Sequence, residues 1–214
     1  LYMNNKIKIV RVLGGLGSQM LAYSLGVELS NRTHSLVKYD FSGVLENPKE
    51  ANNEVLNKIF GIETQNTSSI ESFLIGSNRL TARILRRFLF KFKIVRPYYG
   101  YTKKFNFDES VFSKDRAYYY DCWTSYKYFI KSENEVRNYF KFPPILDAIN
   151  SEILELIHST NSVSIHIRRG DFETFKPLGG LAPISYYEKA INYISENVDN
   201  PVFFVFSNDI EWCK

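Results

Sequence analysis

The chain has 214 residues, 44% hydrophobic and 16% aromatic, which is enough to bury a core in one large domain or two small ones. Its 27 basic and 23 acidic residues leave a mild positive charge that suits an anionic small molecule or a membrane surface and does not demand nucleic acid. No stretch approaches the roughly 20 apolar residues of a membrane helix, and nothing at the start resembles a signal peptide. With only two cysteines, Cys122 and Cys213, we expect no disulfide framework and a cytoplasmic protein, soluble or peripheral at the inner membrane face.

The first 40 residues have the pattern of an α/β unit. Lys6–Val12 (KIKIVRV) alternates and is rich in β-branched residues, which predicts a strand. Leu13–Ser18 (LGGLGS) is a glycine-rich turn, Gln19–Ser30 has helical spacing and Ser35–Tyr39 is a second predicted strand. Strand, glycine turn, helix and strand together indicate a parallel sheet.

The middle of the chain is less regular. Helices are predicted over Asn52–Phe60 and Asn78–Phe92, Tyr98–Tyr120 is broken and aromatic, and Ser125–Phe140 reads as one or two short helices. Pro143-Pro144 ends them. We therefore expect an N-terminal α/β domain over 1–143, with the glycine-rich loop and a helical middle segment, and a C-terminal donor-binding α/β domain over 144–214.

The α/β rhythm returns after the two prolines. The predicted elements are a helix over Leu146–His158, a strand over Ser162–Ile167, a long polar loop over Arg168–Pro183, a helix over Ser185–Asn197, a strand over Pro201–Phe206, and a helix capped by Ser207 or Asp209. Two parallel strands are too few for an independent sheet. The second domain is therefore expected to be incomplete, with part of Phe203–Phe206 exposed.

The strongest chemical signal is Ser164–Phe172, SIHIRRGDF. On a strand, Val163, Ile165 and Ile167 share one face and pack inward, whereas Ser164, His166 and Arg168 share the other. Arg168 and Arg169 then lie where the strand ends, the position at which open α/β sheets bind ligands. Two guanidiniums there suit phosphate oxygens, although an arginine pair that bridges carboxylates such as Asp171 or Glu173 is the alternative.

The second signal is Leu13–Gln19, LGGLGSQ, directly after the first strand. Gly14, Gly15 and Gly17 let a backbone approach a ligand and present N–H groups to an anion. The spacing is neither the dinucleotide fingerprint nor a P-loop, so a plain strand-to-helix turn is the other reading. No Asp-x-Asp motif is present, and His34, His158 and His166 lack metal-ligand spacing, so no metal site is predicted.

Three blocks together resemble the bacterial and animal α-1,2-fucosyltransferases, glycosyltransferase family 11. The family's G-G-L-G-N-Q-M-F-Q-Y-A is similar to residues 14–23, its H-x-R-R-G-D-Y to residues 166–172, and its F-F-V-F-S-D-D-I-E-W-C-K to residues 203–214. Trp123–Phe129 (WTSYKYF) is a weaker match to the family's W-Q-S-E-K-Y-F. The family has Asn where this chain has Ser18, and it continues with a further segment, so the chain resembles a C-terminally truncated member.

The resemblance implies a GT-B-like architecture with two Rossmann-like halves, the second incomplete, and a metal-independent transfer with inversion. L-fucose would pass from GDP-fucose to the 2-hydroxyl of a galactoside-containing glycan or lipid-linked oligosaccharide, with no cofactor besides the donor. Arg168 would meet the charge on the departing diphosphate, with Gly14, Gly15, Gly17, Ser18, Gln19 and Arg169 in substrate binding. His166 would orient the phosphate or sugar, and Asp171 or Glu173 would be the general base.

A basic stretch in the middle segment has two readings. Arg79–Lys93 interleaves arginines and lysines with leucines and phenylalanines, and no acidic residue occurs from Ser72 to Phe107. It is either a packed helix with a solvated basic face or a contact with an anionic membrane. Two alternatives to the transferase also remain at this point: a hydrolase using the same arginine pair, and a non-catalytic sugar-nucleotide-binding remnant of the family.

Overall fold

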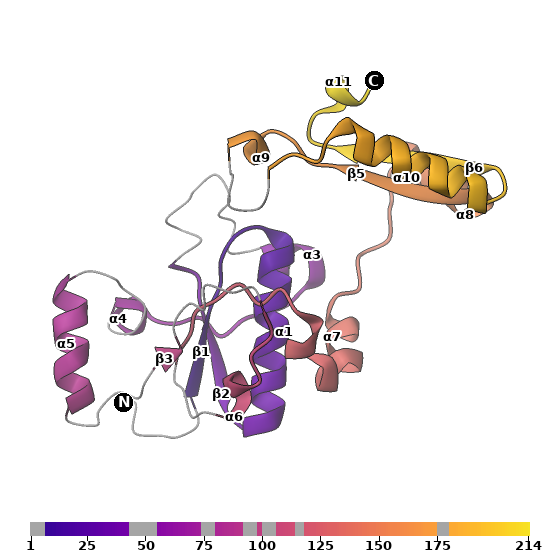
Figure 1. Cartoon of the computed structure of the whole chain (residues 1–214). Coiled ribbons are helices and arrows are strands. Elements are labelled where there is room, and N and C mark those ends of the chain that lie inside the picture. Colours follow the sequence, from indigo (N-terminus) through magenta and orange to yellow (C-terminus); the bar gives the residue numbers. More distant parts are fainter. Residues whose placement is uncertain are drawn as a thin grey trace. The chain divides into compact units, whose positions relative to one another are not determined.

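The computed structural model describes residues 7–42, 55–73, 80–91, 98–99, 106–113, 118–174 and 180–214. The chain divides into two compact units, Leu1–Pro143 and Pro144–Lys214, which follow one another along the colour bar of Figure 1. That each unit folds as a domain of its own stays a prediction.

The first unit contains a parallel sheet. In the described residues its strands are β1 (Ile7–Arg11), β2 (Leu36–Asp40), β3 (Tyr98–Tyr99) and β4 (Tyr118–Tyr119), in the order β2-β1-β4-β3. The mixed α/β prediction with a parallel sheet is therefore confirmed. The prediction for Tyr98–Tyr120 was incomplete, because both ends of that segment join the sheet as two-residue strands.

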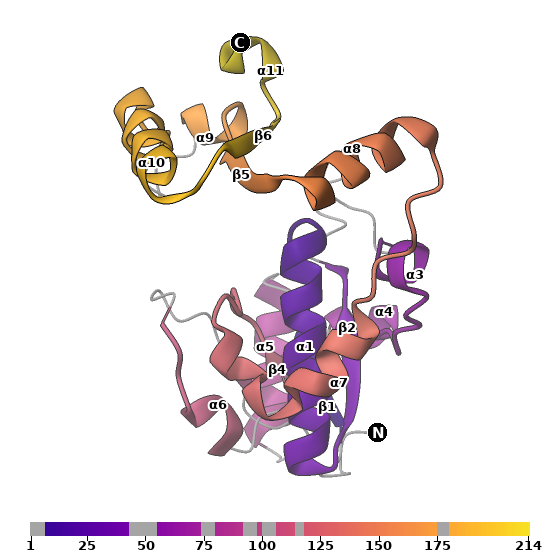
Figure 2. The same cartoon turned by 90° about the vertical axis from the view of Figure 1, so that its right-hand side faces the viewer.

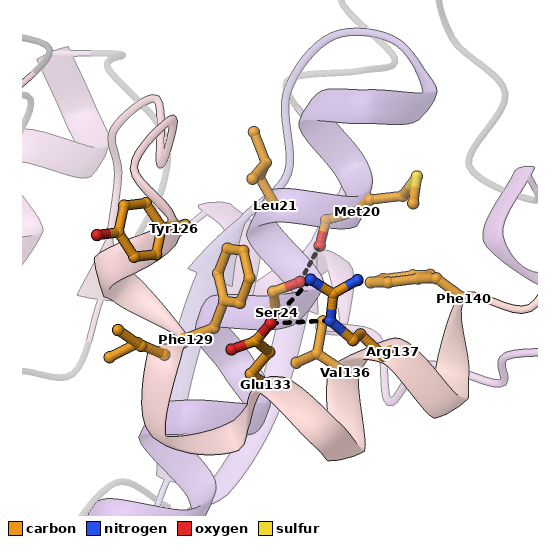
Figure 3. Close-up of a pocket in the computed structure, with 10 residues that line it drawn as sticks. Met20, Leu21, Ser24, Tyr126, Phe129, Glu133, Val136, Arg137 and Phe140 are labelled. Atoms are coloured by element: carbon orange, nitrogen blue, oxygen red, sulfur yellow. Dashed lines mark hydrogen bonds and ion pairs between the residues drawn. The ribbon is translucent and has the colours of Figure 1, made fainter. Parts of the chain in front are cut away.

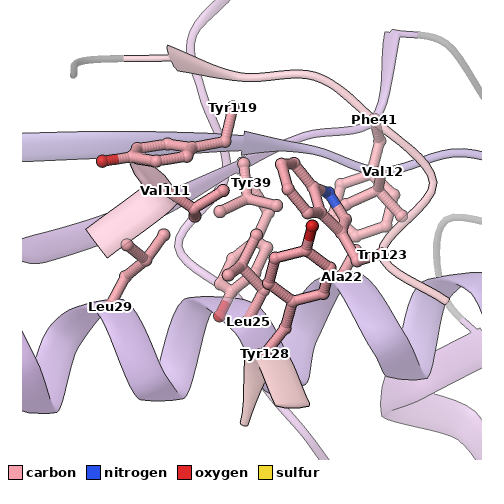
Figure 4. Packing of buried hydrophobic residues seen from close by; sticks show 11 residues of the cluster. Val12, Ala22, Leu25, Leu29, Tyr39, Phe41, Val111, Tyr119, Trp123 and Tyr128 are labelled. Carbon is pink, nitrogen blue, oxygen red and sulfur yellow. The ribbon is translucent and has the colours of Figure 1, made fainter. Parts of the chain in front are cut away.

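Helix α1 (Leu16–Thr33) follows the glycine-rich turn and packs against the sheet, so that the core lies between them. Its Ala22, Leu25 and Leu29 are buried against the sheet, as Figure 4 shows. Aromatic rings fill the space, and Trp123 and Tyr128 meet edge to face with centroids 5.3 Å apart. Both rings belong to the WTSYKYF block, so these two members of that family-like motif maintain the core.

Further helices and turns complete the described residues of the first unit. Their bounds are α3 (Val55–Phe60), α4 (Ser69–Glu71), α5 (Leu80–Lys91), α6 (Ser110–Ser113), the 3₁₀ turns η2 (Tyr126–Tyr128) and η3 (Ile130–Ser132), and α7 (Glu133–Tyr139). The η3–α7 segment is fixed to α1 by a buried carboxylate, because Glu28 accepts the backbone N–H of Ser132 at 2.9 Å and pairs with Arg32 at 2.6 Å. A buried charge satisfied in this way fixes one arrangement of the two segments.

The second unit is built on two parallel strands in the described residues, β5 (Asn161–Ile167) and β6 (Pro201–Ser207). Helices α8 (Ala148–Ser159) and α10 (Ile184–Asn197) lie on opposite faces of this pair, as Figures 1 and 2 show together. The polar loop predicted after β5 contains a short helix, α9 (Asp171–Thr174), and the last helix is α11 (Ile210–Cys213). Val205 and Phe206 are 43% and 50% exposed, which confirms the predicted apolar exposure on β6.

Candidate functional site

The end of β5 carries the first group of candidate residues. Exposure alternates along the strand as predicted: Ile167 is buried, Val163 and Ile165 are partly covered, and Ser164 and His166 are exposed. The exposed face therefore leads to Arg168, whose side chain is also exposed and whose guanidinium carbon lies 4.8 Å from the centroid of the Phe172 ring. His166 and Arg168 are thus presented to solvent from one face of the strand.

Arg169 has different surroundings from Arg168. Its Nε donates to Asp209 at 3.0 Å and its Nη2 to Glu173 at 2.8 Å, while its guanidinium carbon lies 4.4 Å from the centroid of the Trp212 ring. Two carboxylates and an aromatic face hold this cation, so Arg169 joins the loop after β5 to the start of α11. The carboxylate-bridging alternative thus holds for Arg169, and the acids are Glu173 and Asp209. Its role in substrate binding stays a prediction.

The backbone at this turn is also held by the residues that follow β6. The Arg169 N–H donates to Oδ1 of Asn208 at 2.9 Å. Gly170 has φ of 58°, and a Cβ built on it would lie 3.0 Å from Nδ2 of Asn208. A residue with a Cβ would be strained here by the positive φ and by the close neighbour, whereas glycine avoids both problems.

Two of the family-like blocks therefore form one structure. Asp209 caps α11 by accepting the Trp212 N–H, as the sequence predicted for one of its two candidate caps, and also pairs with Arg169. Sequence reasoning did not assign Asn208, Asp209 or Trp212 to the site. All three lie in the family-like block over 203–214, and that block is the sequence signal that could have placed them at the site.

The two candidates for the general base are Asp171 and Glu173. Asp171 is the first residue of α9, but its side chain lies outside what the structure describes, so its role stays a prediction. The Glu173 carboxylate is within 2.8 Å of Arg169. An ion pair occupies this carboxylate, and the base role of either residue stays a prediction.

The glycine-rich loop is the second candidate region, and its three glycines differ. Gly14 has φ of 65°, and a Cβ on it would lie 3.1 Å from the Ser18 Oγ, so the fold itself needs glycine there. A Cβ on Gly15 or Gly17 would meet nothing within 4 Å. The chain leaves open space beside these two glycines, as a backbone does where a ligand approaches closely.

The loop leads directly into α1, whose first turn points N–H groups away from the helix. Gly15 is the N-cap, no side chain caps the helix, and the first intrahelical bond runs from the Gln19 N–H to the Gly15 carbonyl at 3.1 Å. The N–H groups of Leu16, Gly17 and Ser18 precede that bond. A helix start of this kind suits an anion, and Gly15, Gly17 and Ser18 are exposed.

Gln19 occupies a different position from its neighbours. Its side chain is buried, and its Nε2 donates to the Gly14 carbonyl at 3.2 Å. Gln19 therefore holds the loop in shape from within. A direct contact between Gln19 and substrate stays a prediction, and any such contact would require this side chain to leave its buried position.

A pocket of about 500 Å³ opens beside the first turns of α1. Figure 3 shows Met20, Leu21 and Ser24 of α1 on one side and the η2–α7 segment on the other. Aromatic rings and an ion pair between Glu133 and Arg137, 2.8 Å apart, line the second wall. Mostly apolar walls with a few polar groups are typical of small-molecule sites. The aromatic members are Tyr126, Phe129 and Phe140.

A smaller polar cleft of about 360 Å³ lies at the carboxyl end of β2. Its floor is the buried carboxylate of Asp40, which accepts the Tyr118 hydroxyl at 2.8 Å and the Ser72 hydroxyl and Ser42 N–H at 3.0 Å. Burial and the Asp40 charge raise the Tyr118 pKa far above its ordinary value. Since this network joins β2, β4 and the α4 region, we interpret Asp40 as a residue that organises the sheet edge.

Within 7–42, 55–73, 80–91, 98–99, 106–113, 118–174 and 180–214, no three His, Cys, Asp or Glu residues gather as a metal site would require. In the same residues, no helix has the length and apolarity to cross a bilayer.

Comparisons with known proteins agree on a family. The model for "Glycosyl transferase family 11" matches residues 53–214. An alpha-1,2-colitosyltransferase of Escherichia coli is 31% identical over 221 residues, covering 97% of this chain and 71% of its own length. The O-antigen biosynthesis glycosyltransferase WbnK of Escherichia coli is 26% identical over 234 residues, and the match covers 94% of this chain and 72% of WbnK. Human galactoside alpha-(1,2)-fucosyltransferase 1 is 36% identical over 55 residues, and the match covers 24% of this chain and 15% of the human enzyme. No solved structure matches.

Proposed function

Because the chain belongs to glycosyltransferase family 11, we propose that it transfers L-fucose from GDP-fucose to the 2-hydroxyl of a galactoside acceptor, with inversion and without a metal ion. The observation that carries the proposal is the end of β5, where Arg168 is exposed beside a tightly held Arg169. A relative named for colitosyl transfer makes colitose the rival donor sugar.

The leaving group is the chemical problem that these residues address. As the sugar's anomeric carbon separates from the diphosphate, negative charge grows on the β-phosphate, and the Arg168 guanidinium would bind it. Within the first unit, the N–H groups of Leu16, Gly17 and Ser18 form a second place that suits an anion. A charge-assisted hydrogen bond of this kind contributes roughly 1.5–3 kcal/mol. Protein cations in this role would make a divalent ion unnecessary.

The acceptor side needs a binding place and a base. We assign the acceptor sugar to the pocket of Figure 3, because Met20 on its wall follows Ser18 by two residues and its rings and ion pair offer both apolar and polar contacts. Asp171 would take the proton from the attacking 2-hydroxyl. The product is a new glycosidic bond, with GDP released and the proton left on the carboxylate.

A GT-B-like architecture with two Rossmann-like halves is part of this proposal. Parallel sheets in both units support this assignment. The partner molecules would be GDP-fucose and a galactoside glycan or lipid-linked oligosaccharide.

The decisive experiment incubates the chain with GDP-fucose or with nucleotide-activated colitose, plus a β-galactoside, with and without EDTA. We expect fucosyl transfer that EDTA does not abolish. Preferential colitosyl transfer would correct the donor, and loss of turnover that Mg²⁺ restores would overturn the metal-free mechanism. Donor binding without transfer would instead support a non-catalytic remnant, for which Ser18 in place of the family's Asn is the motivating observation.

A further inference from the structure

The helix α5 has a composition that the transfer reaction does not explain. The stretch from Ser72 to Phe107 contains nine lysines and arginines and no acidic residue, and α5 lies within it. Figure 1 shows α5 at the margin of the first unit, away from β1 and α1. A run of positive charge on a peripheral helix indicates an anionic partner.

Two stripes run side by side along the exposed surface of α5. Leu80, Ile84 and Phe88 follow one another at intervals of four and are 70%, 59% and 57% exposed. A second series at the same interval, Arg83, Arg87 and Lys91, is also exposed. Residues four apart share one face of a helix, so each series forms a continuous line.

The buried side of the same helix shows which face is attached to the protein. Ala82 is fully buried, and it lies across the helix from Ile84 and Phe88. Among the side chains of α5 that the structure describes, the small Ala82 is buried, whereas the large apolar residues of the stripe are exposed.

We propose that α5 docks this protein on an anionic lipid bilayer, with Leu80, Ile84 and Phe88 entering the interface and Arg83, Arg87 and Lys91 binding the headgroups. A solvated basic face alone would not expose three large apolar side chains in line. Apolar and cationic stripes next to each other are the pattern of helices that lie in a membrane surface. The proposal does not depend on which sugar the protein transfers.

The test is co-sedimentation of the full chain with vesicles of phosphatidylcholine mixed with phosphatidylglycerol, and with vesicles of phosphatidylcholine alone. We expect binding only to the mixed vesicles. Arg83→Gln with Arg87→Gln should reduce binding at least tenfold, because each basic residue near an anionic surface contributes to binding, and high salt should reproduce the loss. Ile84→Gln with Phe88→Gln should also reduce binding while leaving the charge unchanged. All four changes are on exposed positions, so circular dichroism should show an intact fold.

Lys131→Gln with Lys141→Gln is the matched control, since both lysines are exposed and lie outside α5, and it should bind as the unmodified chain does. An equal loss in this control would mean that net charge alone governs binding, and the proposal would be wrong. Equal binding to both kinds of vesicle would also overturn it. So would a dimer that Ile84→Gln with Phe88→Gln dissociates, since the apolar stripe would then be an interface between copies.

Discussion

Two consecutive arginines follow β5, and the difference in their exposure separates their proposed roles. Arg169 faces Asp209, Glu173 and the Trp212 ring, whereas Arg168 is exposed beside Phe172. Both residues follow the last residue of β5, and the Arg169 backbone is held by Asn208 while its side chain is held by Asp209 and Glu173. We therefore assign the donor phosphate to Arg168 and the shape of the turn to Arg169.

Lysine substitutions at the two positions should separate these roles. Arg168→Lys should lower fucosyl transfer tenfold or more with unchanged stability, because an ammonium cannot supply the planar fork. Arg169→Lys should instead lower the free energy of unfolding by roughly 1 kcal/mol, since it weakens two partly exposed ion pairs and a ring contact. Initial rates and urea unfolding measure the two effects. Transfer by Arg168→Lys within about threefold of the unmodified rate would remove Arg168 from the leaving-group role.

Ser18 is the second residue whose role can be measured. The family carries Asn here, and a hydroxyl has a shorter reach than a side-chain amide. Gln19 is buried and bonded to the Gly14 carbonyl, so it does not replace the missing amide in this conformation. Ser18→Asn should therefore increase transfer several-fold, mainly through the donor KM. A decrease would show that the chain has adapted its loop to serine.

The chain passes from β1 into α1 through the glycine-rich turn. Substitutions can distinguish the glycines that the fold requires from those that a ligand would require. Gly14→Ala should cost about 1–2 kcal/mol of stability, because its φ is positive and the Ser18 Oγ is close. Gly17→Ala should be neutral or stabilising for the fold, since its Cβ meets open space within a helix. If the donor approaches this backbone, Gly17→Ala should nevertheless raise the Kd for GDP. Unchanged GDP binding would support the plain strand-to-helix turn.

The pocket beside α1 is the next element with a measurable role. Tyr126 on its wall is 61% exposed, so Tyr126→Ala should leave stability nearly unchanged while raising the acceptor KM and leaving the donor KM as it was. Tyr193→Ala is the control, since Tyr193 is a similarly exposed tyrosine on α10. An unchanged acceptor KM in Tyr126→Ala, or an equal rise in the control, would move the acceptor elsewhere.

The elements that sequence predicted well are those with a repeating pattern. The alternating KIKIVRV and SVSIHI segments became β1 and β5, and the helical spacings became α1, α8 and α10. The two tyrosine strands β3 and β4 were missed because two residues show no alternation. The place of β4 is fixed by distant contacts, such as the Tyr118 hydroxyl on Asp40 and the buried Lys8 amine on the Tyr119 hydroxyl. The same reason explains why Asn208 and Asp209 were missed around Arg169, since both interactions span about 40 residues of sequence.

The whole molecule carries two candidate anion sites, one in each unit. Gly17 and Ser18 belong to the first unit, and Arg168 belongs to the second. Each strand end has the chemistry of an anion site by itself, so each can be tested by itself.

GDP titration of Gly17→Ala and Arg168→Lys tests each region by itself. Arg168→Lys should raise the Kd for GDP roughly tenfold or more, because an ammonium cannot supply the planar fork to the phosphate. Gly17→Ala should raise this Kd only if the donor approaches the backbone of the glycine-rich loop. Their effects on thermal unfolding without donor should add within about 0.5 kcal/mol, which serves as the control. An unchanged Kd in Arg168→Lys would mean that the arginine strand end does not bind the diphosphate.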